Sequence, residues 1–289
     1  MLKVEQLHVT LKNGTNEIAV LHDINFSIKR GQVVGVIGES GSGKSVLCTS
    51  ILQLYRNKRK MTGDIIFKGT SVVTMPEKDM RKLRGKEIGL MMQNPMSMFN
   101  PIVSIGQHFI ESLQAHRKMS KKEALLQAEV QLSIFQLNDP TILKKYPHEL
   151  SGGMLQRVMI AMTASLEPSL LLADEPTTAL DTTTQLEILK QLKQLQVSKK
   201  MGMLIVSHDL GVIANIATEI IVMRHGIIVE KGPTSHILLH PVHPYTKILV
   251  AARDEHLSLD ELDGHFDGVI TGELVMCDTD HWVRMEAHI

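Results

Sequence analysis

Residues 33–45 read VVGVIGESGSGKS, and this stretch decides the fold class. Its first part, residues 33–38, is almost wholly apolar, as is typical of a central parallel strand covered on both faces. Residues 38–45 match the pattern GxxxxGK(S/T) and lead into a helix that we expect from about Lys44. Glycines let a backbone approach a polyphosphate closely, and a helix N-terminus adds positive potential. The stretch therefore predicts a phosphate-binding loop, in preference to a glycine-rich turn that binds nothing.

Two side chains at the end of this loop have predicted roles of their own. Lys44 should reach the β- and γ-phosphates of a nucleotide, and the Ser45 hydroxyl should ligate magnesium. The residues expected to contact the nucleotide are Gly38, Glu39, Ser40, Gly41, Ser42, Gly43, Lys44, Ser45 and Val46.

Residues 170–176, LLLADEP, form the expected companion: an apolar strand that ends in two carboxylates. Asp174 should hold the magnesium through its water shell. Glu175 should lie beside the γ-phosphate and polarise the attacking water as general base. Alone, such an acidic pair is more often an ordinary strand end. The phosphate-binding loop upstream favours the catalytic interpretation.

Residues 150–154, LSGGM, describe a helix start that suits an anion. Ser151 is a good N-cap, and the two glycines after it permit close approach to the positive end of the helix. The segment resembles the LSGGQ signature of ABC transporter ATPases, with Met154 in place of the usual glutamine. The resemblance implies that Ser151, Gly152 and Gly153 close on the γ-phosphate held by a second subunit. Each ATP would then lie between two chains.

The other elements of that family follow in order. Gln93 resembles the Q-loop glutamine, which senses magnesium and the attacking water and connects to the membrane subunits. Residues 179–181, ALD, resemble the D-loop at the dimer seam, and His208 resembles the switch histidine that contacts the γ-phosphate. A lone histidine after a strand is usually structural, but the accompanying motifs reverse that expectation. The resemblance covers residues 1–250 approximately and implies ATP and Mg2+ as cofactors, with Ser45, Gln93 and Asp174 around the metal.

Strands that alternate with helices predict an α/β fold with a parallel sheet, interrupted by a helical insert at about 95–165. Ser120 followed by Glu123 predicts a capped helix start within that insert. The family resemblance adds a P-loop NTPase core with an N-terminal antiparallel β subdomain. We expect an ATP-binding domain over 1–250 and an extension over 251–289 with a little β structure. The other expected elements are strands near 4–9, 24–28, 203–206, 219–223 and 227–230, a helix over 181–200 and a short helix after 243–246.

Composition limits the classes of partner. Lysine and arginine, 31 together, balance 31 aspartates and glutamates, so binding to a nucleic-acid backbone is disfavoured. The two cysteines, Cys48 and Cys277, form no CxxC pair, which favours a reducing compartment. The start lacks a signal-peptide layout, and no apolar run approaches the roughly 20 residues of a membrane-crossing helix. We therefore expect a peripheral protein on the cytoplasmic face of the cell membrane, attached through partners.

Several segments resemble one branch of the family, the oligopeptide, dipeptide and nickel importers. They are QNP at 93–95, FNP at 99–101, SGGMLQR at 151–157 and HPYT at 243–246. MMQNP at 91–95 and GMLQR at 153–157 look closer to nickel and metallophore members than to dipeptide members. The branch implies a second, paralogous ATPase subunit, two transmembrane permease subunits and an extracytoplasmic substrate-binding protein. The implied cargo is nickel or a metal chelate, with a di- or oligopeptide as the alternative. A soluble ABC ATPase of DNA repair or translation is a third hypothesis.

Two departures from family patterns limit the prediction. Residues 1–25 contain no aromatic residue to stack on adenine, so Ile18 or Val20 could supply an apolar contact in its place. Longer peptide-branch members carry a cysteine cluster for an iron–sulfur centre near the C-terminus. Cys277 alone cannot ligate such a cluster, so we predict none, although residues 280–283 resemble a degraded form of that segment.

Overall fold

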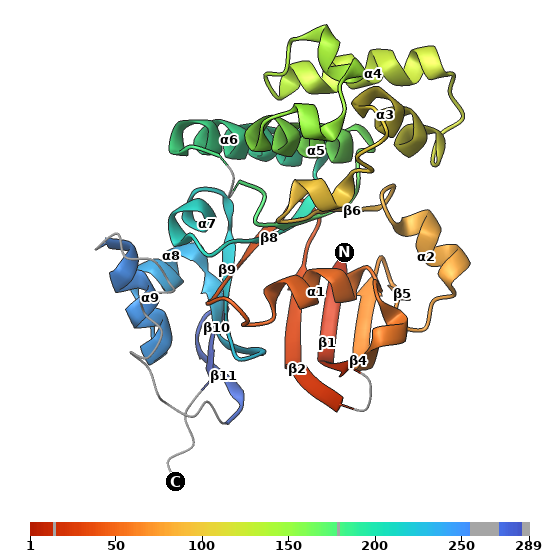
Figure 1. The fold of residues 1–289 in the computed structure, drawn as a ribbon. Coiled ribbons are helices and arrows are strands. Elements are labelled where there is room, and N and C mark those ends of the chain that lie inside the picture. Colours follow the sequence, from red (N-terminus) through yellow and green to blue (C-terminus); the bar gives the residue numbers. More distant parts are fainter. Residues whose placement is uncertain (14–15, 178–179, 255–271, 285–289) are drawn as a thin grey trace. The chain divides into compact units, whose positions relative to one another are not determined.

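The computed structural model describes residues 1–13, 16–177, 180–254 and 272–284 (Figure 1). The chain divides into two compact units: unit 1 comprises Met1–Met75 and Gly202–Ile289, and unit 2 comprises Pro76–Met201. Among the described residues, no helix is long and apolar enough to cross a membrane.

Unit 1 contains an antiparallel four-stranded sheet, which confirms the predicted N-terminal β subdomain. The apolar side chains Leu2, Val4, Leu7 and Val9 of its first strand are buried. The second strand extends well beyond the predicted residues 24–28. Its first half was not predicted, because it is exposed and shows no apolar alternation. In sheet order the strands are β2 (Asn16–Ile28), β1 (Leu2–Asn13), β4 (Arg59–Phe67) and β5 (Thr70–Ser71), with a short 3₁₀ turn over Arg56–Lys58.

The second sheet of unit 1 carries the phosphate-binding loop. Its central strand β3 (Val33–Ile37) is buried throughout and pairs in parallel with β8 (Gly202–Val206) and β9 (Glu219–Arg224). These strands are apolar along their whole length, as the sequence predicts. A strand that is covered on both faces has no solvent-exposed face for polar side chains. The loop that follows β3 leads into α1 (Lys44–Ile51), and β8 leads into α7 (Leu210–Ile216).

The C-terminal elements continue the same sheet. Strand β10 (Ile227–Pro233) pairs with β9 and, through Glu230 and Val283, with β12 of a terminal hairpin. The β structure expected in the extension is this hairpin; residues 255–271 and 285–289 of the extension lie outside the described residues. The remaining elements here are α8 (Thr234–Leu239), α9 (Pro244–Asp254), β11 (Leu274–Asp278) and β12 (His281–Arg284).

Unit 2 combines two parallel strands with the predicted helices. Helix starts are set by side-chain caps: Ser120 forms the predicted capping box with Glu123, and Ser151 and Asp181 cap the next two long helices. Its strands are β6 (Ile88–Met91) and β7 (Leu170–Asp174), and its helices are α2 (Glu77–Leu83), α3 (Ile105–Gln114), α4 (Lys121–Ile134), α5 (Gly152–Ser165) and α6 (Thr182–Lys199), with 3₁₀ turns at Pro95–Met98, Pro140–Lys144 and Pro147–Glu149.

Candidate nucleotide-binding site

The phosphate-binding loop of unit 1 needs glycine at two positions for packing reasons. A Cβ atom at Gly38 would lie 2.1 Å from the carbonyl oxygen of Met223 in β9. Gly43 has a φ of +98°, and a Cβ there would lie 2.6 Å from Leu21 of β2. Any side chain at either position would push the loop off the strands that support it. The glycines thus let the loop curve tightly against the sheet.

Lys44 lies inside the curve of this loop. Its Nζ donates to the carbonyl oxygens of Gly38 and Glu39, each at 2.6 Å, and to Ser42 Oγ at 3.2 Å. The side chain is buried, so its charge is held by loop carbonyls in place of water. A phosphate oxygen entering the loop can take over these hydrogen bonds, and the ammonium therefore fits the predicted phosphate contact. Ser45 is exposed, and Val46 is half-buried, on the first turn of α1.

His208 lies at the same edge of this sheet as the loop. Strands β3 and β8 pair in parallel, with Val36 opposite Val206, so the segments that follow them emerge together. His208 is exposed at the end of β8, and the Asp209 carboxylate next to it caps α7 by accepting from the N–H of Gly211 at 2.7 Å. The cap fixes the chain direction after the histidine, so that His208 lies at the carboxyl end of the pair formed by β3 and β8.

In unit 2, the Q-loop glutamine and the acidic pair come together. Strands β6 and β7 pair in parallel, with Met91 opposite Ala173, and Gln93 Nε2 donates to Glu175 Oε2 at 2.8 Å. Asp174 is buried at the end of β7. Glu175 has a φ of +48°, a left-handed conformation that costs a non-glycine residue about 1–3 kcal/mol. This turn takes the chain sharply out of the strand at the residue predicted to be the general base.

The signature segment, also in unit 2, forms an open helix start. Ser151 Oγ accepts from the N–H of Met154 at 3.3 Å, which is the predicted N-cap of α5. Ser151 and Gly152 are exposed, and a Cβ atom at Gly152 would meet nothing within 4 Å. The positive end of α5 is therefore accessible to a large anion.

The D-loop resemblance is only partly described. Ala179 lies outside the described residues, whereas Asp181 is described and caps α6 by accepting from the N–H of Thr184 at 3.0 Å. The same hydrogen bond lowers the pKa of Asp181 below its ordinary value, so the cap stays ionised at neutral pH.

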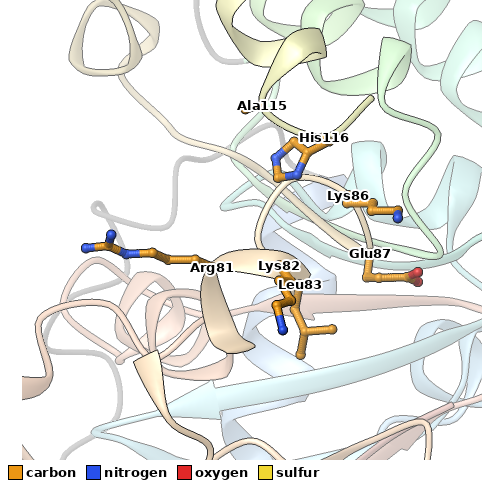
Figure 2. A pocket seen from close by; sticks show the side chains of 7 residues that line it. All are labelled: Arg81, Lys82, Leu83, Lys86, Glu87, Ala115 and His116. Atoms are coloured by element: carbon orange, nitrogen blue, oxygen red, sulfur yellow. The ribbon is translucent and has the colours of Figure 1, made fainter. Parts of the chain in front are cut away.

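A cavity of about 460 Å³ in unit 2 was not predicted from the sequence (Figure 2). The pKa of its half-buried His116 is lowered by burial and by the nearby charges of Lys86 and Arg117. Two of its cations have carboxylate partners: Lys82 pairs with Asp79 at 2.7 Å and Arg81 with Glu77 at 3.4 Å. The lining residues are Arg81, Lys82, Leu83, Lys86, Glu87, Ala115 and His116. Sequence reasoning had no signal for it, because residues 81–87 and residues 115–116 come together only in the folded unit.

A glycine loop between a buried parallel strand and a helix, with an internal lysine, defines the class of P-loop nucleoside triphosphate hydrolases. Comparison with known proteins narrows this class. The sequence profile of the ABC transporter family matches residues 21–178. The chain is 40% identical to the metal-staphylopine import system ATP-binding protein CntD of Staphylococcus aureus, over 92% of this chain and 97% of that protein. The chain belongs to the ABC transporter family.

Further relatives support the same assignment. The glutathione import ATP-binding protein GsiA of Escherichia coli is 38% identical over 91% of this chain, which spans 44% of that longer protein. A solved dimeric ATP-binding cassette in a post-hydrolysis state, bound to ADP and Pi, matches with a TM-score of 0.74 and 28% identity, covering 81% of this chain and 99% of that one. The predicted fold class, ATPase activity and use of ATP with Mg2+ are confirmed by these relationships.

Proposed function

We propose that this chain is the ATP-hydrolysing subunit of an importer for a metal chelate or nickel. The observation that carries the proposal is the pairing of two anion sites in one chain: a buried phosphate-binding loop with Lys44 inside it, and an exposed helix start at Ser151. A nucleoside triphosphate bound between two cassettes contacts one site of each kind. A homologous cassette in the dimeric post-hydrolysis state supports this arrangement.

The residue roles follow from the chemistry of each group. Gly38–Val46 binds the phosphates, and Lys44 neutralises the charge that develops on the β- and γ-phosphates. Ser45 and Asp174 suit Mg2+ because a hydroxyl and a carboxylate are hard oxygen ligands. The metal, when bound, neutralises phosphate charge. Glu175 takes the proton of the attacking water. The remaining contacts are Gln93 beside Glu175 and the metal, His208 at the γ-phosphate, and Ser151, Gly152 and Gly153 from the neighbouring cassette.

The partners and location complete the proposal. We assign the ATP-binding domain to residues 1–250, with a helical subdomain at about 95–165, and an extension to 251–289. The chain pairs with a paralogous ATPase subunit on the cytoplasmic face of the membrane and acts on two permease subunits. A substrate-binding protein delivers the cargo on the other side. Importer relatives that span nearly all of this chain support the transport role over DNA repair or translation.

The cargo is the least constrained part of the proposal. A metal chelate is favoured by the relative named for metal-staphylopine import, and a peptide is the alternative, favoured by the relative named for glutathione import. The test is ATP-dependent uptake into vesicles that contain the full complex, offered free nickel, a nickel chelate or a dipeptide. Uptake of the chelate or of nickel supports the proposal, and uptake of the dipeptide alone would replace it. Copurification with no membrane protein would instead favour a soluble ATPase.

A further inference from the structure

A tyrosine from the C-terminal part of unit 1 contacts the phosphate-binding loop. The backbone N–H of Glu39 donates to the hydroxyl of Tyr245 at 3.1 Å, across 206 positions of sequence. Tyr245 is 1% exposed and Glu39 is 8% exposed, so water does not compete strongly for this contact. A buried N–H group that loses its acceptor is costly. The hydroxyl therefore determines which way this peptide of the loop faces.

The side chain of Glu39 is held at the same point. Arg224, the last residue of β9, places Nε 4.0 Å from Glu39 Oε2, and its guanidinium lies 5.0 Å from the centroid of the Tyr245 ring. Burial and the Glu39 carboxylate raise the pKa of Tyr245 well above its ordinary value. The phenol therefore stays protonated at neutral pH and can accept from the Glu39 N–H while its own proton faces a carboxylate.

The tyrosine is itself fixed by buried polar contacts. Tyr245 N–H donates to His243 Nδ1 at 3.1 Å, which shapes the chain at the start of α9. The carboxylate of Glu230, in β10, accepts from the N–H groups of Val242 at 2.8 Å and His243 at 3.0 Å. His281 of β12 hydrogen-bonds the same carboxylate at 2.7 Å. The segment before α9 is thus tied to the sheet and to the C-terminal hairpin.

A phosphate-binding loop gains affinity when its donors already face the ligand site, because the entropy of ordering is not lost on binding. In this loop the peptide group between Gly38 and Glu39 donates its N–H to Tyr245, and its carbonyl oxygen, that of Gly38, accepts from Lys44. Both polar groups of this peptide are therefore hydrogen-bonded, and it cannot rotate without breaking these bonds.

We propose that Tyr245 is a positioning residue of the nucleotide site: its hydroxyl, through Glu39, holds the phosphate-binding loop in the conformation that receives ATP. This inference rests on the nucleotide site proposed above and adds to it a residue beyond the ATP-binding motifs. It also makes the segment before α9 part of the ATPase machinery, because that segment orients the tyrosine.

The test compares Tyr245→Phe with a matched control, Thr234→Val, in the full chain. The first removes the hydroxyl and keeps the buried ring. The second removes a half-buried hydroxyl that donates to the Ala217 carbonyl at 2.8 Å. Ala217 lies just before the start of β9, whereas Arg224 is at its end. We expect Tyr245→Phe to raise the Kd and KM for Mg-ATP about 3- to 10-fold, with kcat changed less than about 2-fold. Thr234→Val should lower the unfolding temperature comparably while its Kd stays within about 1.5-fold.

Hydrogen exchange gives a second readout, one that needs no variant to fold. In the nucleotide-free wild type, the Glu39 amide should exchange at least about 10-fold more slowly than the amides of Ser40 and Gly41, which are exposed. Equal exchange of these amides, or equal Kd values for Tyr245→Phe and wild type, would overturn the inference. Failure of the wild type to bind Mg-ATP at all would overturn the nucleotide site itself.

Discussion

The phosphate-binding loop and the start of α5 are both predicted anion sites, yet they are built in opposite ways. The loop is supported from below by β9 and β2, and its lysine is buried among loop carbonyls. The start of α5 has one capping serine and an exposed glycine with open space beside it. The first site is preorganised within its own unit, whereas the second offers the positive end of a helix with open space beside it. This contrast suits a loop that binds nucleotide alone and a helix start that acts on nucleotide held by another chain.

The largest effect should come from the interior of the loop. Lys44→Ala removes the buried ammonium, and we expect the Kd for Mg-ATP to rise at least about 100-fold, on the order of 3 kcal/mol. Isothermal titration calorimetry measures it. Lys58→Ala, an exposed lysine of the same unit, is the control and should leave the Kd unchanged. Unchanged binding in Lys44→Ala would mean that the loop is not the nucleotide site.

The next effect separates binding from hydrolysis. Glu175→Gln removes the proposed general base, so phosphate release should fall about 10²- to 10⁴-fold while the Kd for Mg-ATP changes only a few-fold. The ATP-bound variant should accumulate as a dimer on a sizing column. Glu187→Gln is a matched control, because Glu187, like Glu175, accepts from a glutamine amide, that of Gln136 at 2.9 Å. Substantial residual turnover in Glu175→Gln would contradict the base assignment.

Two of the serine caps of unit 2 sharpen the comparison directly. Ser151→Ala and Ser120→Ala each remove one N-cap and should each cost about 1 kcal/mol of stability. Only Ser151→Ala should also slow hydrolysis, by about 5- to 10-fold, without changing the Kd of a monomer for Mg-ATP. Chemical unfolding and phosphate release, measured on both variants, check this. Equal hydrolysis rates in the two variants would remove the functional role from the start of α5.

How far the sequence predicts this molecule depends on whether a feature is local. The glycine loop, the cap at Ser151 and the helix after Asp181 are where they were expected, because each follows from backbone chemistry within a few residues. We predicted no element over residues 59–91, where the structure has β4, β5, α2 and β6. Most residues of β4 are exposed or half-buried, so its apolar pattern is weak.

The site shows the same division. The pairing of Gln93 with Glu175 joins two residues that the family motifs already single out. The left-handed backbone at Glu175 and the Tyr245 contact to Glu39 have no local signature, since both depend on how distant strands and helices pack. The site residues themselves stay predictions, tested by the variants above.

The smallest expected effect is a pH dependence of the free energy of unfolding. It arises in unit 2 and does not involve the phosphate-binding loop. The folded-state pKa of His116 is lowered by burial, Lys86 and Arg117, so the unfolded chain binds its proton more tightly than the folded chain. Stability is therefore full above the ordinary histidine pKa of about 6.5 and declines as pH falls from there toward the folded pKa. His116→Gln should flatten this decline in urea unfolding between pH 7.5 and 5.5. The Kd for Mg-ATP should respond to pH alike in wild type and variant; a His116-dependent change in it would link the cavity of unit 2 to the nucleotide and weaken the contrast between the two anion sites.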